Sequence, residues 1–181
     1  MRRTTVFVLM IIWVLLCNAC AGNNERISEE LRLFKERAVV LPDNLLAHNN
    51  DSRMPSDTTL LNRPYRMIVY INQNDCNECV LRTLVPVYLF MLENEHRENF
   101  GVIFLLNTPE VEITNAILTN MRFFRTVFYD LEGNFERLNP HLPKNERYHV
   151  FLLNEHSKVV LAGQFASMER YRIKLDRLEV L

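Results

Sequence analysis

The chain has 181 residues, of which 48% are hydrophobic and 24% charged, a composition typical of one globular domain with an ordinary core. Its formal net charge is -1, so no strongly basic surface points to nucleic acid as a partner. Four glycines and seven prolines are too few for low-complexity segments.

Residues 1–19 have the pattern of a signal peptide that is removed on export. Two arginines precede the apolar run Val6–Leu16, and this run of about 11 residues is short for a membrane-spanning helix. Ala19 directly before Cys20 resembles a bacterial lipobox, and the resemblance implies that Cys20 carries lipid and becomes the mature N-terminus. Residues 20–26 would then form a lipidated tether. An uncleaved short anchor or an ordinary secretory signal is the alternative.

Export and lipidation account for two of the four cysteines, because Cys17 leaves with the signal peptide and Cys20 carries the lipid. Cys76 and Cys79 remain in the folded part. A disulfide-stapled exported scaffold needs more than one bridge, and closing so short a loop stabilises little. The pair is therefore expected to be kept for its reactivity, without a cofactor.

The two cysteines lie where a predicted strand meets a predicted helix. Tyr65–Ile71 is β-branched and aromatic, which predicts a buried strand, and Val80–Glu95 is long and apolar enough for a core helix kinked at Pro86. A helix N-terminus offers unpaired N–H groups and a positive dipole end to the first sulfur of Cys76-Asn77-Glu78-Cys79, which favours the thiolate. This arrangement is typical of a redox-active dithiol.

Residues 27–64 are predicted to form an extension and a loop before that strand. Glu29–Val40 has apolar residues at helical spacing, and it gives way to Val39-Val40-Leu41-Pro42, which indicates a short edge strand stopped by proline. Ala47–Pro64 is polar and rich in turn residues, which predicts a long surface loop.

Beyond residue 95, predicted strands and helices alternate, which is typical of a parallel sheet covered by helices on both faces. A final hairpin adds antiparallel strands, so the sheet is expected to be mixed and the fold class to be α/β. The predicted strands are Gly101–Leu106, Thr126–Tyr129 and the hairpin strands Val150–Leu153 and Lys158–Leu161. After the first strand, Thr108 is expected to cap a helix with Pro109 at its first position and an apolar face of Ile113, Ala116, Ile117 and Met121. A turn at Glu132-Gly133 leads to helix Asn134–Leu138, and Ser167 is expected to cap the last helix.

Five stretches in this order carry a family resemblance: the strand, CNEC opening a helix, FLLN, VFYDLEGNFERLN and VFLLNEHSKVVLAG. Together they resemble the TlpA-like thioredoxins, and more closely the thioredoxin-like lipoproteins of Bacteroidota. The resemblance implies a thioredoxin-like three-layer sandwich for residues 65–181, with a mixed central sheet flanked by helices. It also implies thiol–disulfide exchange in which Cys76 attacks and Cys79 resolves.

For location and partners, the resemblance implies an exported, lipid-anchored protein of the cell envelope, on the periplasmic side of the inner or outer membrane. Its partners would be the membrane, through the N-terminal lipid, and envelope proteins that carry disulfides or donate electrons as thiols.

Three positions depart from the thioredoxin pattern around the dithiol. Asp75 stands where tryptophan is common, Tyr70 where a buried aspartate serves the second cysteine, and His149 where a cis-proline opens the strand before the hairpin. The expected groove is therefore formed by Asp75, Tyr148 and His149. Asp75 and Glu78 also disfavour the thiolate, which opposes the helix terminus and leaves the sign of the effect on the redox potential open.

Two other functions remain open. If His149 faces the pair, Cys76, Cys79 and His149 together could hold Cu(I) or Zn, although a strand histidine with a satisfied ring is the simpler interpretation. A thioredoxin-like fold could also serve as a non-catalytic binding module that displays its loops to a partner. A peroxiredoxin-like activity is not expected, because Gln73 stands where those enzymes have threonine.

Overall fold

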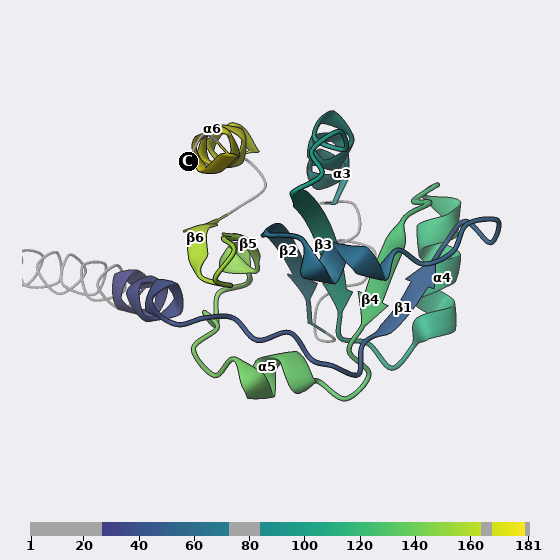
Figure 1. Cartoon of the computed structure of the whole chain (residues 1–181). Helices are drawn as coiled ribbons and strands as arrows, with labels where there is room; N and C mark the ends of the chain where they lie inside the picture. Colours follow the sequence, from purple (N-terminus) through teal and green to yellow (C-terminus); the bar gives the residue numbers. More distant parts are fainter. Residues whose placement is uncertain (1–26, 73–83, 164–167, 180–181) are drawn as a thin grey trace, which may run out of the picture.

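A mixed sheet lies at the centre of the protein (Figure 1). The computed structural model describes residues 27–72, 84–163 and 168–179. The strands in these ranges are β1 (Leu46–Asn49), β2 (Tyr65–Ile71), β3 (Phe100–Leu106), β4 (Thr126–Tyr129), β5 (Val150–Leu153) and β6 (Val159–Ala162). They follow one another across the sheet in the order β1-β4-β3-β2-β5-β6. β2, β3 and β4 run parallel, while β1, β5 and β6 each pair antiparallel with a neighbour.

Several residues singled out by the sequence lie outside the described residues. They are the signal peptide, the lipidation candidate Cys20, the dithiol Cys76 and Cys79 with Asp75 before it, and the helix cap Ser167. Within the described ranges, no helix is long and apolar enough to cross a bilayer.

β2 is a central strand, and its bounds confirm the predicted strand Tyr65–Ile71. It lies between β3 and β5 and pairs with both. Its side chains alternate between the two faces of the sheet, so that Met67 and Val69 enter one hydrophobic cluster and Ile68 and Tyr70 the other. β3 is buried along its whole length, as its continuous apolar run predicts.

One face of the sheet is covered by α3 (Val85–Glu93), α4 (Val111–Asn120) and α6 (Met168–Glu179). Figure 1 shows α3 and α6 on the same side of the sheet, above the strands. α6 turns one side toward the sheet, where Tyr171 and Leu175 are fully buried.

The opposite face is covered by a helix at residues 27–36 and by α5 (Asn134–Leu138) (Figure 1). Phe34 and Phe135 are the fully buried aromatic residues that these two helices contribute. Helices on both faces of a mixed sheet confirm the predicted three-layer α/β sandwich. The bounds of α5 and the hairpin of β5 and β6 also agree with the sequence prediction.

The predicted surface loop Ala47–Pro64 is correct only for its middle, residues 50–57, because regular structure occupies residues on either side. β1 pairs antiparallel with β4 at the edge of the sheet, with Ala47 opposite Phe128. η1 (Thr58–Asn62) is a 3-10 helix whose first turn is capped by Asp57. The strand has only four residues, two of them polar, and it is stabilised by backbone pairing to its neighbour, which the sequence pattern does not reveal.

The first helix ends earlier than predicted, at residue 36 instead of Val40. Residues 39–42, the predicted edge strand, form no strand, and the nearby bridge pairs Ala38 with Lys158. Val40 is held instead by the amide of Asn139. The Asn139 side chain accepts a hydrogen bond from Val40 N–H (2.9 Å) and donates one to the Val40 carbonyl (2.8 Å). The side-chain amide of Asn139 therefore satisfies the backbone groups of Val40, where the hydrogen bonds of a paired strand were expected.

One predicted helix is described only in part, and another begins later than predicted. α3 is described from Val85, with Pro86 in its first turn, where proline is tolerated. Residues 80–83 of the predicted helix lie outside the described residues, so the predicted kink stays a prediction. α4 begins at Val111. Thr108 Oγ1 accepts a hydrogen bond of 3.1 Å from Glu110 N–H before the helix starts, so Thr108 stabilises the turn that leads into α4 and does not cap it.

The buried face of α4 agrees with the predicted face at Ile117 and Met121, which pack against the core, and differs from it elsewhere. Ile113 is 54% exposed and Ala116 is exposed, whereas Thr114 and Leu118 are buried. The Thr114 hydroxyl donates a hydrogen bond of 2.9 Å to the Glu110 carbonyl, which satisfies it inside the core. A threonine buried in this way breaks the apolar periodicity on which the prediction depended.

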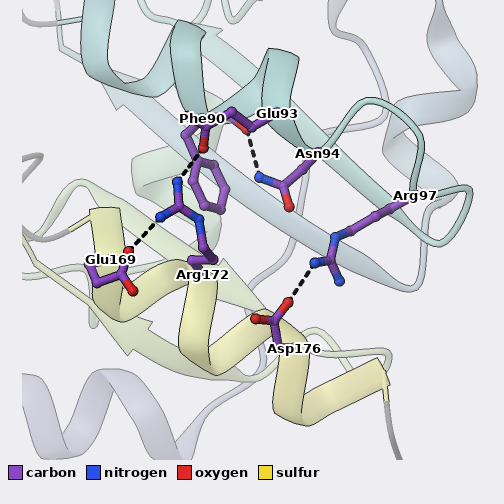
Figure 2. A network of polar contacts seen from close by, with 7 residues as sticks. All are labelled: Phe90, Glu93, Asn94, Arg97, Glu169, Arg172 and Asp176. Atoms are coloured by element: carbon purple, nitrogen blue, oxygen red, sulfur yellow. Dashed lines mark hydrogen bonds and ion pairs between the residues drawn. The ribbon is translucent and has the colours of Figure 1, made fainter.

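A polar network ties α6 to α3 on the outer side of this layer (Figure 2). Arg172 of α6 contacts Glu169 on its own helix and Glu93 at the end of α3, and Arg97 contacts Asp176 nearby. Since Arg172 and its two partners are exposed, solvent and salt screen them, and they orient the two helices more than they stabilise them.

Candidate functional site

The carboxyl end of β2 is the point from which the chain enters the CNEC segment. β2 ends at Ile71, and Asn72 is the last residue described before that segment. The candidate site therefore consists, among the described residues, of the side chains that surround this strand end.

His149 lies beside the end of β2. Its backbone carbonyl accepts a hydrogen bond of 2.9 Å from Tyr70 N–H, and its ring centroid lies 5.3 Å from that of Tyr70. The ring nitrogen Nε2 lies 2.9 Å from the Pro143 carbonyl oxygen, which is an acceptor, so we assign the Nε2 proton to this bond. His149 is buried, whereas the other predicted groove residue, Tyr148, is half-buried at the end of η2 (Glu146–Tyr148).

Tyr70 occupies the strand position where the family pattern has an aspartate. It is 3% exposed, and its hydroxyl donates a hydrogen bond of 2.9 Å to Glu136 Oε1. Burial raises the pKa of the Tyr70 phenol, and the neighbouring Glu136 carboxylate raises it further. The hydroxyl therefore stays protonated and acts as a donor toward Glu136.

Glu136 brings a carboxylate to this strand end from a different element. It lies in the first turn of α5 and is exposed to solvent. Its Oε1 atom accepts hydrogen bonds from the Tyr70 hydroxyl and from Asn72 Nδ2, which are both neutral donors. Among the described residues, no cation lies within ion-pair distance of this carboxylate.

Asp130 fixes the start of α5 and with it the position of Glu136. Asp130 follows β4 and is 1% exposed, and its carboxylate accepts hydrogen bonds from the backbone N–H groups of Asn134 (2.9 Å) and Phe135 (2.7 Å). Gly133 before the helix has a φ of 65°, a left-handed conformation that glycine adopts at little cost. The sharp turn and the buried acid together direct α5 under the sheet.

Asn107 connects the carboxyl ends of β2 and β3. Its backbone N–H donates a hydrogen bond of 2.9 Å to the Ile71 carbonyl, and its Nδ2 lies 3.5 Å from the Tyr70 hydroxyl. A Cβ added to Gly133 would come 3.4 Å from the same Nδ2, so the turn before α5 packs on this amide. The ends of three parallel strands thus meet in one polar cluster, formed by Tyr70, Asn72, Asn107, Asp130 and Glu136.

A cavity of about 280 Å³ opens beside Glu136 and His149. Its lining includes the charged side chains of Glu136, Lys144 and Glu146 as well as apolar residues. Its volume is close to the lower end of the range for ligand pockets in proteins. The lining residues are Asn72, Glu136, Asn139, Pro140, Leu142, Pro143, Lys144, Glu146 and His149.

No motif or spacing in the sequence marks Glu136 or Asn72 as residues of this site. The available signal was topological, because the carboxyl ends of neighbouring parallel strands meet at one edge of a sheet, and the turn after β4 lies at that edge. A five-residue helix is too short for its apolar spacing to show which side chain faces the strand ends.

Solved structures of other proteins have a fold similar to that of this chain, although their sequences differ from it. No protein-family model and no curated protein sequence matches this chain. StoA from Bacillus subtilis superposes with a TM-score of 0.51 at 9% identity, over 72% of this chain and 99% of StoA. A thiol-disulfide oxidoreductase from Bacteroides fragilis superposes with a TM-score of 0.51 at 10% identity, over 76% of this chain and 99% of its own. The chain therefore has a thioredoxin-like fold.

Proposed function

We propose that the chain exchanges disulfides with client proteins through Cys76 and Cys79. The observation that supports this most strongly is the position of β2, a central strand of a thioredoxin-like sheet that leads directly into the CNEC segment. A dithiol after such a strand would be presented at the sheet edge where Glu136 and His149 line a cavity.

In the proposed reaction, the Cys76 thiolate attacks one sulfur of a client disulfide, and the other client sulfur leaves as a thiolate. Cys79 then attacks the Cys76 sulfur of the mixed disulfide, which releases the client as a dithiol. The client gains a pair of electrons and two protons, and the protein is left with a Cys76–Cys79 disulfide. A thiol donor of the envelope would reduce it again, so no cofactor is required.

We also propose where this exchange takes place. The protein would act in the cell envelope, held to the membrane by lipid on Cys20 after removal of residues 1–19, with Asp75, Tyr148 and His149 bordering the groove for the client. Mass spectrometry of the purified N-terminus tests the anchor. A lipid-modified Cys20 at the N-terminus is expected, whereas an intact signal segment or an unmodified Cys20 would contradict it.

The activity is tested with the membrane-anchored chain purified in detergent, using insulin as the disulfide substrate and dithiothreitol as the reductant. The wild type is expected to accelerate insulin reduction, and Cys76→Ser is expected to abolish the acceleration. Cys79→Ser should accumulate a mixed disulfide between Cys76 and the substrate, visible by mass. A wild type that does not accelerate the reaction, with no mixed disulfide in Cys79→Ser, would overturn the proposal.

A second candidate is a non-catalytic binding module, which Tyr70 and His149 favour because they stand where the family has a carboxylate and a proline. An inactive wild type that still captures a partner would support it. A copper or zinc site formed by Cys76, Cys79 and His149 would instead show one equivalent of metal that is lost in His149→Ala. Since His149 Nε2 contacts the Pro143 carbonyl, Nδ1 would be the ligating nitrogen.

A further inference from the structure

We propose that the cavity beside Glu136 binds a lysine side chain of the client, so that the protein prefers clients with a lysine next to the reacting cysteine. This inference rests on the proposed disulfide exchange and names its substrate class. It depends on the described residues around the cavity and on the charge that they leave unbalanced.

The Glu136 carboxylate is held in place by neutral groups. Tyr70 and Asn72 both donate to Oε1, which fixes the orientation of the carboxylate but does not neutralise it. Glu136 is exposed, and it has no cationic partner among the described residues. A carboxylate that is oriented in advance and faces an open cavity attracts a cation without the cost of ordering its own side chain.

The two oxygens of Glu136 differ in what they can still accept. Oε1 already receives two donors, which fill the two acceptor positions of a carboxylate oxygen, while Oε2 has no partner among the described residues. The ammonium group of lysine is a point donor that needs one oxygen. The guanidinium group of arginine binds best as a fork to both oxygens. The arrangement at Glu136 therefore suits lysine better than arginine.

The rest of the cavity fits the stem of such a side chain. Pro140, Leu142 and Pro143 are the apolar residues of its lining. A lysine can bury its methylene groups against apolar residues while its charged end reaches a polar group. A cavity of about 280 Å³ is small for a drug-sized ligand but has room for one long side chain.

The charge balance of the lining also favours a cation. The lining includes two carboxylates, Glu136 and Glu146, and one ammonium group, Lys144. These described side chains therefore give the cavity a net negative charge. A glutamate in the client at the same place would be repelled, so the cavity favours clients with lysine and disfavours clients with glutamate.

The test measures disulfide exchange with three short peptides whose cysteine carries a thionitrobenzoate group and is flanked by lysine, norleucine or glutamate. The reduced, detergent-purified chain attacks the peptide sulfur and releases thionitrobenzoate, whose absorbance gives the rate. Each rate is divided by the rate of the same peptide with glutathione, which removes differences in intrinsic reactivity. We expect the lysine peptide to react about two- to fivefold faster than the norleucine peptide, the range of an exposed ion pair.

The variant Glu136→Gln keeps the acceptor for Tyr70 and Asn72 but removes the charge, so it should lose the preference for lysine. Sodium chloride at about 0.5 M should reduce the preference of the wild type. Glu132→Gln is the matched control. Glu132 is also exposed, it precedes α5 and bonds Asn134, and it does not line the cavity, so its loss should leave the preference unchanged.

The outcomes separate this inference from the proposed function. Exchange with all three peptides at equal normalised rates, or a lysine preference that survives Glu136→Gln, would overturn the inference and leave disulfide exchange standing. Failure of the wild type to release thionitrobenzoate from any of the peptides would overturn both.

Discussion

The Tyr70 hydroxyl donates a hydrogen bond of 2.9 Å to the Glu136 carboxylate, and this bond joins the central strand β2 to α5. The strand thereby buries a neutral phenol where the family pattern would bury an acid. Burying a phenol that has a partner costs less than burying a carboxylate, and the acid is carried instead by the exposed first turn of α5. The sheet edge next to the CNEC segment keeps a negative charge on its solvent side.

Tyr70→Phe should remove this bond while preserving the packing of the ring. We expect the free energy of unfolding to fall by about 1 kcal/mol, because one partly buried hydrogen bond is lost, and the preference for lysine peptides to weaken as Glu136 loses a donor. Urea denaturation and the exchange assay measure the two effects. Tyr129→Phe is the matched control, since Tyr129 is also buried and donates to Asn115 Oδ1 (2.6 Å). Equal weakening of the preference in both variants would contradict the assignment.

Asp130→Asn should destabilise the protein by about 2 kcal/mol. The carboxylate accepts from two backbone N–H groups at the start of α5, and an asparagine would turn its own NH₂ donor toward one of them. Denaturant unfolding followed by circular dichroism gives the difference. Glu132→Gln, on the exposed turn between Asp130 and α5, should change the free energy of unfolding by less than about 0.5 kcal/mol. An equally stable Asp130→Asn would show that the buried carboxylate does not hold the helix.

Arg122→Gly should stabilise the protein by about 1 kcal/mol. Arg122 has a φ of 56°, and it ends α4 in a Schellman motif, with Phe123 N–H donating to the Leu118 carbonyl and Arg122 N–H to the Thr119 carbonyl, both at 2.9 Å. Glycine adopts this conformation without the steric cost that arginine meets. Thermal unfolding at equal protein concentration measures the gain. Arg122→Ala, which keeps the Cβ, should show no gain, and equal stabilisation by both variants would contradict the explanation.

Stability should fall steeply above about pH 10. Burial raises the pKa of Tyr70, Tyr129 and Tyr171 above the ordinary phenol value of 10.0. In the unfolded chain these phenols lose their protons first, so the unfolded state binds fewer protons than the native state at high pH. The free energy of unfolding is therefore fully retained below pH 10 and decreases as the pH rises. Urea unfolding between pH 8 and pH 11 checks this, as approximate limits around the phenol value.

The variant Tyr171→Phe isolates one of these groups. It removes a titrating phenol that is fully buried, so the decrease of stability with pH should become less steep than in the wild type, although the variant is less stable at neutral pH. An unchanged slope would mean that Tyr171 does not contribute to the alkaline transition.

The parts of the fold that the sequence predicts correctly are those with dense local signals. β2 and β3 are continuous apolar runs, and such runs indicate buried strands because each face of the sheet is covered. α5 is bounded by Gly133, whose left-handed turn starts it, so its limits could be read from the residues themselves. In these places local conformation and burial favour the same structure.

The parts that the sequence does not predict depend on partners distant in the chain. β1 has only four residues and no clear alternation of apolar and polar side chains, and its pairing with β4 decides that it is a strand. Glu136 becomes part of the site because Asp130 and Gly133 turn α5 under the strand ends, and no periodicity encodes that contact. Asn139 replaces a strand ladder at Val40 for the same reason. Each of these features requires a tertiary contact, which single-sequence patterns do not contain.

The amide of Asn139 has a mechanical consequence. It fastens Val40 to the end of α5 through two hydrogen bonds, and the N-terminal helix lies just before that point in the chain. Tension applied from the N-terminal end would reach the Ala38–Lys158 bridge and then this pair of hydrogen bonds before it reached β2 along the chain. A protein suspended by that end would therefore transmit a pull to the helix that carries Glu136, and through the Glu136 carboxylate to Tyr70 of the central strand.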